Sequence, residues 1–132
     1  MSDTAPNPAD AMPFSRLMGV RVTDAKPDRI VGDLTVRDDL CTAGGIMHGG
    51  AIMAFADALG AVGAFMNLPE GAGGTTTVES KTNFLSAAPA GQRVTGVATP
   101  VSLGRRLSVW QTEIVREDGR KVALVTQTQM VL

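Results

Sequence analysis

The chain has 132 residues, a formal net charge of −1, 44% hydrophobic residues and 19% charged residues. This composition is ordinary for one globular domain with a hydrophobic core, and the small net charge excludes a general attraction to nucleic acid or to an anionic membrane. The chain has one cysteine and one histidine. These exclude an intrachain disulfide and make a poor ligand set for a metal ion, so we expect no metal site.

Residues 1–12 are rich in Pro, Ala and Asp, and they predict a disordered tail before a single domain over residues 13–132. The tail has neither the basic region nor the apolar region of a signal peptide, and we therefore expect a cytoplasmic protein. Residues 13–18 predict a short helical turn with Pro13 near its start.

Six segments have the residue types and the flanking turn signals of strands. Two of them precede a central loop and helix, and four follow Gly74, where we expect a meander. Pro100 suggests an edge position or a bulge. This order indicates an α+β fold, an antiparallel sheet of five to six strands with one long helix on a face. The predicted strands are residues 19–25, 29–36, 75–85, 92–103, 107–116 and 121–132.

Between the two groups of strands lie a glycine-rich loop with the only histidine, His48, and the only long helical segment, residues 49–66. That helix has one charged residue, Asp57. A helix that is apolar all round is a buried helix, and a carboxylate within it costs free energy unless it is paired or used. Asp57 and the glycines argue against a membrane span. Asp57 is the first candidate for chemistry; alternatively, it only hydrogen-bonds across an interface.

The spacing between His48 and Asp57 limits how they can cooperate. Nine residues of helix place the two side chains about 180° apart and roughly 13 Å apart along the axis. A site that uses both therefore needs a second copy of the chain. Gly49 and Gly50 begin the helix, where free N–H groups favour an anionic ligand; alternatively, they only permit close packing. One helix covers little of a six-stranded sheet, which also favours a homo-oligomer, a dimer or a dimer of dimers.

Four motifs stand out along the chain: His48-Gly49-Gly50-Ala51, Ala56-Asp57, the strand from Thr77-Val78-Glu79 to Asn83-Phe84-Leu85, and the turn Ala88-Pro89-Ala90-Gly91. With this order of elements they resemble the hotdog-fold acyl-CoA thioesterases, in particular their phenylacetate-degradation-type (PaaI-like) branch. The resemblance covers roughly residues 14–132. It implies a sheet wrapped around the central helix, dimers that pair their sheets edge to edge, and active sites at the subunit interface.

The resemblance also implies the catalytic residues. Asp57 would be the nucleophile or the general base, the Gly49 amide would hold the oxyanion, and His48 would orient the thioester or its leaving group. Thr77 stands where related enzymes often have a Ser or Thr that positions water. Thr42 stands six residues before the histidine, where related enzymes commonly have Asn or Gln.

Coenzyme A would be part of the substrate, and no metal or organic cofactor would be needed. For its phosphates we expect Arg105 and Arg106, because a pair of loop arginines suits bidentate contact, together with Lys81. The alternative for the two arginines is a solvated turn. Gly50 completes the predicted substrate-binding residues.

The resemblance thus implies hydrolysis of an acyl-CoA thioester to free acid and CoA. Two other functions remain open: a hydratase or dehydratase of enoyl or hydroxyacyl thioesters, and a non-catalytic acyl-CoA-binding protein. Aryl, short aliphatic and medium aliphatic acyl groups are all candidates. Nucleophilic and general-base attack are both compatible with Asp57, and dimers and tetramers are both compatible with the uncovered sheet.

Overall fold

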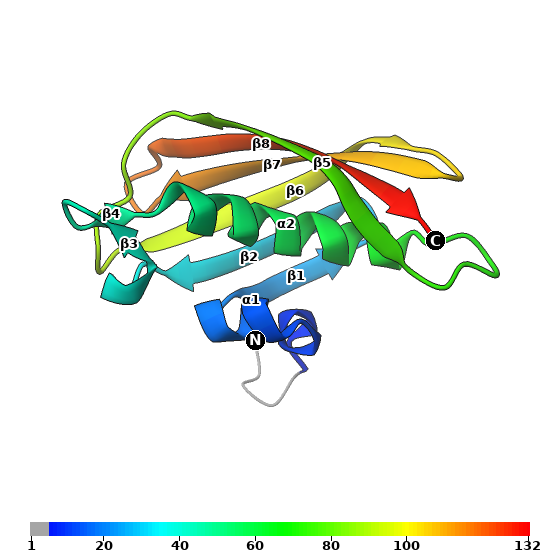
Figure 1. The fold of residues 1–132 in the computed structure, drawn as a ribbon, viewed down its shortest axis with the longest axis horizontal. Coiled ribbons are helices and arrows are strands. Elements are labelled where there is room, and N and C mark those ends of the chain that lie inside the picture. Colours follow the sequence, from blue (N-terminus) through cyan, green and yellow to red (C-terminus); the bar gives the residue numbers. More distant parts are fainter. Residues whose placement is uncertain (1–5) are drawn as a thin grey trace.

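A six-stranded antiparallel sheet curves around one long helix, α2 (Gly49–Met66), in the computed structural model, which describes residues 6–132 (Figure 1). The predicted α+β architecture is confirmed. Each predicted helix and strand is present, with ends within two residues of those expected. The other elements of the main fold are α1 (Pro13–Met18), β1 (Arg21–Lys26), β2 (Arg29–Thr35), β5 (Thr75–Phe84), β6 (Arg93–Leu103), β7 (Leu107–Arg116) and β8 (Lys121–Val131).

The strand order is β1-β2-β6-β7-β8-β5. The prediction of a four-stranded meander is wrong for β5, because β6, β7 and β8 form a meander while β5 crosses the sheet and pairs with β8. The segment after β5 is no tight hairpin: the Met47 N–H donates to the Ala88 carbonyl (2.8 Å), and the Gly91 N–H donates to the Val36 carbonyl (2.8 Å). β5 is therefore an edge strand, and its outer edge pairs with no strand among residues 6–132.

A small hairpin that the sequence did not predict precedes α2. It consists of β3 (Cys41–Thr42) and β4 (Ile46–Met47), and it follows a 3-10 helix, η2 (Asp38–Leu40). Gly44 (φ 90°) and Gly45 (φ 72°) make its turn in the left-handed region, which glycine adopts without steric cost. The hairpin fixes the position at which α2 begins.

Part of the predicted disordered tail is ordered. Residues 1–5 lie outside the described residues, but Pro8–Ala11 form a 3-10 helix, η1, with Ala9 fully buried. Asn7 joins η1 to β1: its side chain donates to the Val20 carbonyl (2.9 Å) and accepts from the Val22 N–H (3.0 Å). Composition did not reveal this segment because a few specific hydrogen bonds, rather than an apolar run, hold it in place.

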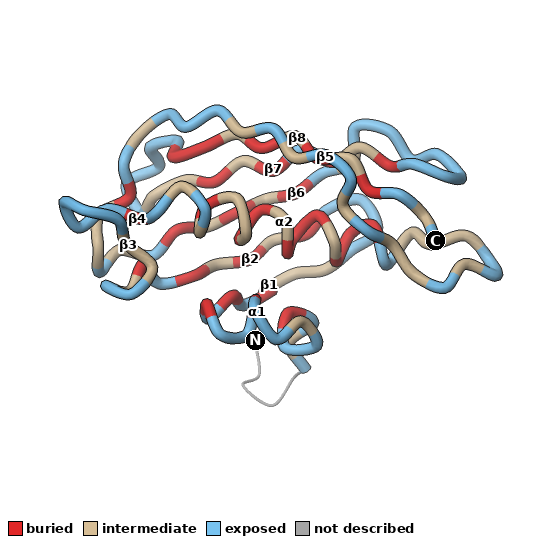
Figure 2. Tube along the Cα trace, in the orientation of Figure 1, coloured by how far each residue is buried: buried red, intermediate tan, exposed pale blue. Residues whose placement is uncertain are grey.

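Burial alternates along the strands and follows one side of α2 (Figure 2). Two glycines let α2 approach the sheet closely. A Cβ atom at Gly63 would lie 2.5 Å from the ring of Trp110, and one at Gly60 would lie 2.3 Å from the side-chain amide of Gln127. By length and composition α2 could cross a membrane, but half of it is buried inside the fold, and core helices meet the same criterion.

The close approach at Gly63 predicts the effect of adding one methyl group there. Gly63→Ala should lower the free energy of unfolding by roughly 1–3 kcal/mol, because the buried Trp110 ring must move. Improved helix propensity offsets at most about 1 kcal/mol of that cost. The measurement is urea unfolding at fixed protein concentration. Gly73→Ala is the control, since no atom lies within 4 Å of the added methyl group. Equal stability of the two variants would contradict the contact with Trp110.

Candidate active site

The carboxylate of Asp57 is half-buried on the side of α2 that faces β5 and β8. Its Oδ1 accepts hydrogen bonds from Thr77 Oγ1 (2.6 Å) and Gln127 Nε2 (3.3 Å). Thr77 Oγ1 accepts from Gln129 Nε2 (2.5 Å), and Thr75 Oγ1 donates to Gln129 Oε1 (3.0 Å). Within residues 6–132, no side chain or backbone group hydrogen-bonds Oδ2. The sheet therefore holds one oxygen of the carboxylate and leaves the other available to a reactant.

Thr77 hydrogen-bonds Asp57 directly. A threonine hydroxyl has one proton, and here it is donated to the carboxylate while the oxygen accepts from Gln129. Thr77 therefore orients Asp57. Its predicted role in positioning water stays a prediction, and in this arrangement such a water could only donate to the remaining lone pair of the hydroxyl.

A bulge in β5 determines which of its side chains face α2. Residues 77 and 84 are seven apart, so regular alternation would place them on opposite faces of the sheet. The register shift at Val78 adds one residue. As a result Thr77 and Phe84 both face the helix, while Glu79 lies on the outer face with Thr128 (Oγ1 to Oε1, 3.5 Å). The Phe84 ring covers Gly49, because a Cβ atom there would lie 3.3 Å from it.

His48 caps the start of α2. Its Nδ1 accepts a hydrogen bond from the Gly50 N–H (2.8 Å). An accepting Nδ1 carries no proton, so the proton of the neutral ring is on Nε2, which can donate to a ligand. The Gly50 N–H is thus occupied, whereas the Gly49 N–H has no partner among the described residues. This separates the two glycines: Gly49 has the amide that is free to bind an oxyanion.

The predicted catalytic residues form two groups within one chain. Asp57 and Thr77 meet at the middle of α2, and His48, Gly49 and Gly50 lie together at its start, nine residues away. His48 lines a cavity of about 520 Å³ together with Phe14 and Arg37. Thr42, on β3, lies at the same end of the fold and is exposed.

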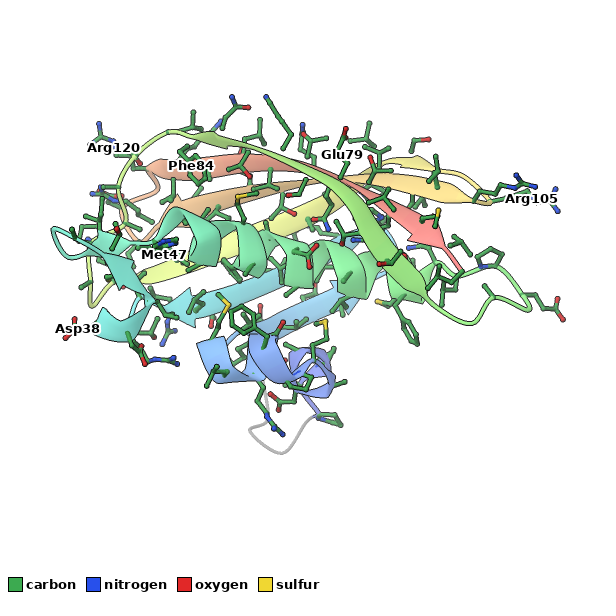
Figure 3. All side chains as sticks on the ribbon, viewed as in Figure 1. Asp38, Met47, Glu79, Phe84, Arg105 and Arg120 are labelled. Carbon is green, nitrogen blue, oxygen red and sulfur yellow. The ribbon has the colours of Figure 1, made fainter. Side chains whose placement is uncertain are left out.

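The residues predicted to bind phosphate are not brought to either group within one chain. Lys81 lies on the outer face of β5, where its Nζ donates to Asn83 Oδ1 (2.7 Å). Arg105 and Arg106 lie in the turn between β6 and β7. Figure 3 shows Arg105 at the end of the molecule opposite the start of α2. Any contact from these residues to the site would have to come from another copy of the chain.

The family model of the thioesterase superfamily matches residues 44–123, which include His48, Asp57 and Thr77. The chain belongs to this superfamily. A putative esterase of Deinococcus radiodurans is 35% identical over 120 residues, which cover 90% of this chain and 79% of that protein. The 1,4-dihydroxy-2-naphthoyl-CoA hydrolase of Escherichia coli is 40% identical over 76 residues, which cover 58% of this chain and 54% of that protein.

A solved structure, a mutant of the phenylacetic acid degradation protein PaaI from Thermus thermophilus, is similar with a TM-score of 0.83 and 31% identity. The match covers 91% of this chain and 99% of that chain. The predicted resemblance to PaaI-like hotdog thioesterases is therefore confirmed, and so is the prediction of an enzyme that hydrolyses thioesters.

Sequence analysis of this thioesterase missed Gln127 and Gln129, both fully buried, and the position of Phe84. A signal for the glutamines was available. They share the parity of the core residues Ala123 and Val125 along β8, so alternation places both amides on the face that meets α2. Polar residues in phase with a core face indicate a buried polar network. The position of Phe84 depends on the bulge, which the sequence did not indicate.

The contact between Thr77 and Asp57 predicts how a thioesterase with an altered Thr77 will behave. Thr77→Val keeps the shape but removes the donor to Asp57, so kcat for thiol release should fall roughly tenfold to a hundredfold with little change in KM. Thr77→Ser keeps the hydroxyl and should retain most of the activity. Thermal unfolding of both variants provides the control for folding. An unchanged kcat in Thr77→Val would show that the hydrogen bond plays no part in the reaction.

Proposed function

We propose that this thioesterase hydrolyses an acyl-CoA thioester to the free acid and CoA. Its site would combine Asp57 of one subunit with His48 and Gly49 of a second subunit. The observation that carries the proposal is the separation of two complementary groups: a carboxylate with a free oxygen and an amide N–H without a partner, far apart on one helix. The name of the relative in Escherichia coli, a hydrolase of a CoA thioester, supports the same reaction class.

The free edge of β5 supports a symmetric dimer that would join these groups. If two copies of β5 pair antiparallel along their whole length, the two-fold axis passes between Glu79 and Ser80, the centre of the strand. On β5, Thr77 contacts Asp57 and Phe84 contacts Gly49. The midpoint between Thr77 and Phe84 lies between Ser80 and Lys81, within one residue of the two-fold axis.

A two-fold axis at that midpoint would bring Thr77 of each copy opposite Phe84 of the other copy. Asp57, beside Thr77, would then lie opposite Gly49 of the other copy, which would create two equivalent sites. The edge residues Val78, Phe84 and Leu85, which are more than half exposed in one chain, would be covered by this pairing.

The two groups divide the chemistry between them. The thioester carbonyl oxygen would bind the Gly49 N–H at the positive end of α2, which stabilises the negative charge that develops on it. His48 Nε2–H would donate to the carbonyl or to the departing sulfur. In one route Asp57 Oδ2 takes a proton from the water that attacks the carbonyl carbon; the C–S bond breaks, the free acid forms, and Asp57 returns the proton to the departing sulfur. In the other route Oδ2 attacks the carbon itself, the C–S bond breaks to give an acyl-aspartyl anhydride, and a water molecule then hydrolyses that anhydride to the free acid and Asp57. The departing thiolate takes its proton from solvent in this second route, and CoA leaves as the thiol in both.

We propose Arg105 and Arg106 as contacts for the CoA phosphates, with Lys81 as a further candidate, and Thr42 and Gly50 as groups that line the thioester. Within an oligomer the arginines would reach a site of another subunit, since they lie far from the site of their own chain. The reaction as proposed needs no metal or organic cofactor, and a cytoplasmic location stays a prediction.

Replacement of Asp57 tests the reaction. Asp57→Asn keeps an oxygen that can accept from Thr77 and Gln127 but cannot take a proton or attack, so kcat for thiol release should fall roughly 10²- to 10⁴-fold without loss of folding. Thiol release is followed with a disulfide reagent across a panel of acyl-CoAs. Loss of the enoyl absorbance of crotonyl-CoA without free thiol would indicate a hydratase, and tight binding without turnover would indicate a binding protein.

A mixture of two inactive variants tests the shared site. Asp57→Ala and His48→Ala should each be nearly inactive, yet a dimer with one copy of each has one intact site. After complete exchange half of the dimers are mixed, so about a quarter of wild-type activity should return. Subunit exchange is verified with two fluorescent labels. Exchange without any return of activity would rule out the shared site.

A further inference from the structure

A cavity of about 700 Å³ lies between η1 and the C-terminal half of α2. Nothing in the chemistry described above uses it. Its lining has a single polar side chain, that of Thr75; the principal apolar residues are Pro8, Met12, Ala25, Ala61 and Phe65. The volume is well within the range of ligand pockets, roughly 300–1,000 Å³.

The cavity lies about one helical turn beyond Asp57 along α2. Ala61 follows Asp57 by one helical turn on the same face of α2, about 6 Å along the axis. Thr75 precedes Thr77 by two residues on the same face of β5, about 7 Å along the strand. Because α2 and β5 run in opposite directions here (Figure 1), Ala61 and Thr75 are both displaced from Asp57 and Thr77 toward the C-terminal end of α2. The cavity thus begins about one helical turn from the carboxylate of Asp57.

The lining has no side-chain donor that is free to recognise an acidic substituent. Its only side-chain donor, the Thr75 hydroxyl, directs its one proton to Gln129 Oε1 (3.0 Å) and the Met130 carbonyl (3.1 Å). A carboxylate in this cavity would lose its water without gaining a side-chain donor, which disfavours it. The volume also exceeds the need of one ring, since an apolar cavity of about 150 Å³ already holds benzene.

We infer that this cavity holds the acyl chain of the substrate, and that the acyl group is an uncharged aliphatic chain of medium length. The inference rests on the proposed function, because it takes the thioester carbon to be at Asp57. The acyl chain runs from there along α2 toward its C-terminal end, past Ala61 to Phe65. Met12 and Pro8 close the opposite side, so η1 contributes to the selection of chain length.

Two substitutions on opposite walls test this assignment. Ala61→Leu narrows the entrance, so kcat/KM for decanoyl-CoA should fall roughly tenfold or more, while kcat/KM for acetyl-CoA changes less than about twofold. Met12→Ala enlarges the far wall and should move the preferred chain length upward. The matched control is Ala87→Leu, which adds the same volume at an exposed position in the loop after β5 and should leave the profile unchanged. Wild type should prefer octanoyl- or decanoyl-CoA to acetyl-CoA and to benzoyl-CoA.

Binding of thioether analogues separates this inference from the proposed hydrolysis. Decyl-CoA, which cannot be hydrolysed, should bind wild type and Asp57→Asn at least tenfold more tightly than ethyl-CoA, and Ala61→Leu should remove that preference. If the analogues show this preference while no acyl-CoA releases thiol, the proposed hydrolysis is wrong but the assignment of the cavity to the acyl chain is supported.

Three results would overturn the acyl pocket. One is a preference for acetyl-CoA or benzoyl-CoA, and another is an equal loss at every chain length in Ala61→Leu. The third is a changed oligomeric mass in Ala61→Leu with an unchanged chain-length profile, which would assign the cavity to a second copy of the chain.

Discussion

The hydrogen bond from Thr77 to Asp57, 2.6 Å long, joins the central helix to the edge strand, and the site depends on it. An apolar helix does not tolerate an unpaired carboxylate, so the sheet must supply donors. Thr77 and Gln127 supply them, and Gly60 makes room for the Gln127 amide by omitting a side chain. The Oε1 of Gln127 is buried without a partner among residues 6–132. A buried oxygen that stays without a partner costs about 1–3 kcal/mol.

The bulge at Val78 gives β5 its two contacts with α2. Without the extra residue, either Thr77 or Phe84 would face away from the helix, and one of the two groups would lose its neighbour. With the bulge, Thr77 lies beside Asp57 and Phe84 lies beside Gly49, and these two strand residues are nearly symmetric about the centre of β5. An edge strand exposes unpaired N–H and C=O groups that favour pairing with another strand. The same strand therefore orients the carboxylate and carries the symmetry that the proposed dimer needs.

Local patterns in the sequence were sufficient to predict α2, with His48 at its start and Asp57 near its middle, because helix propensity, a lone charge and a glycine-flanked histidine are each visible within a few residues. The pairing of the strands could not be predicted from such local patterns. The pairing of β5 with β8 joins residues about fifty positions apart, and the loop after β5 hydrogen-bonds Met47 instead of forming a tight hairpin with β6. Phe84 reaches Gly49 only through the bulge, and η1 depends on the hydrogen bonds of Asn7.

The groups that the proposed function uses are arranged along the axis of α2. The free amide of Gly49 is at its start, the carboxylate of Asp57 is at its middle, and the apolar cavity extends from Ala61 to Phe65. In the proposed dimer an antiparallel copy of the helix would reverse that order. The amide of one copy would then face the carboxylate of the other, and the acyl chain would leave this point along its own helix toward the C-terminal end. CoA would have to leave in the other direction, past the first turn of the partner helix, where the N-terminal dipole favours its negative charge.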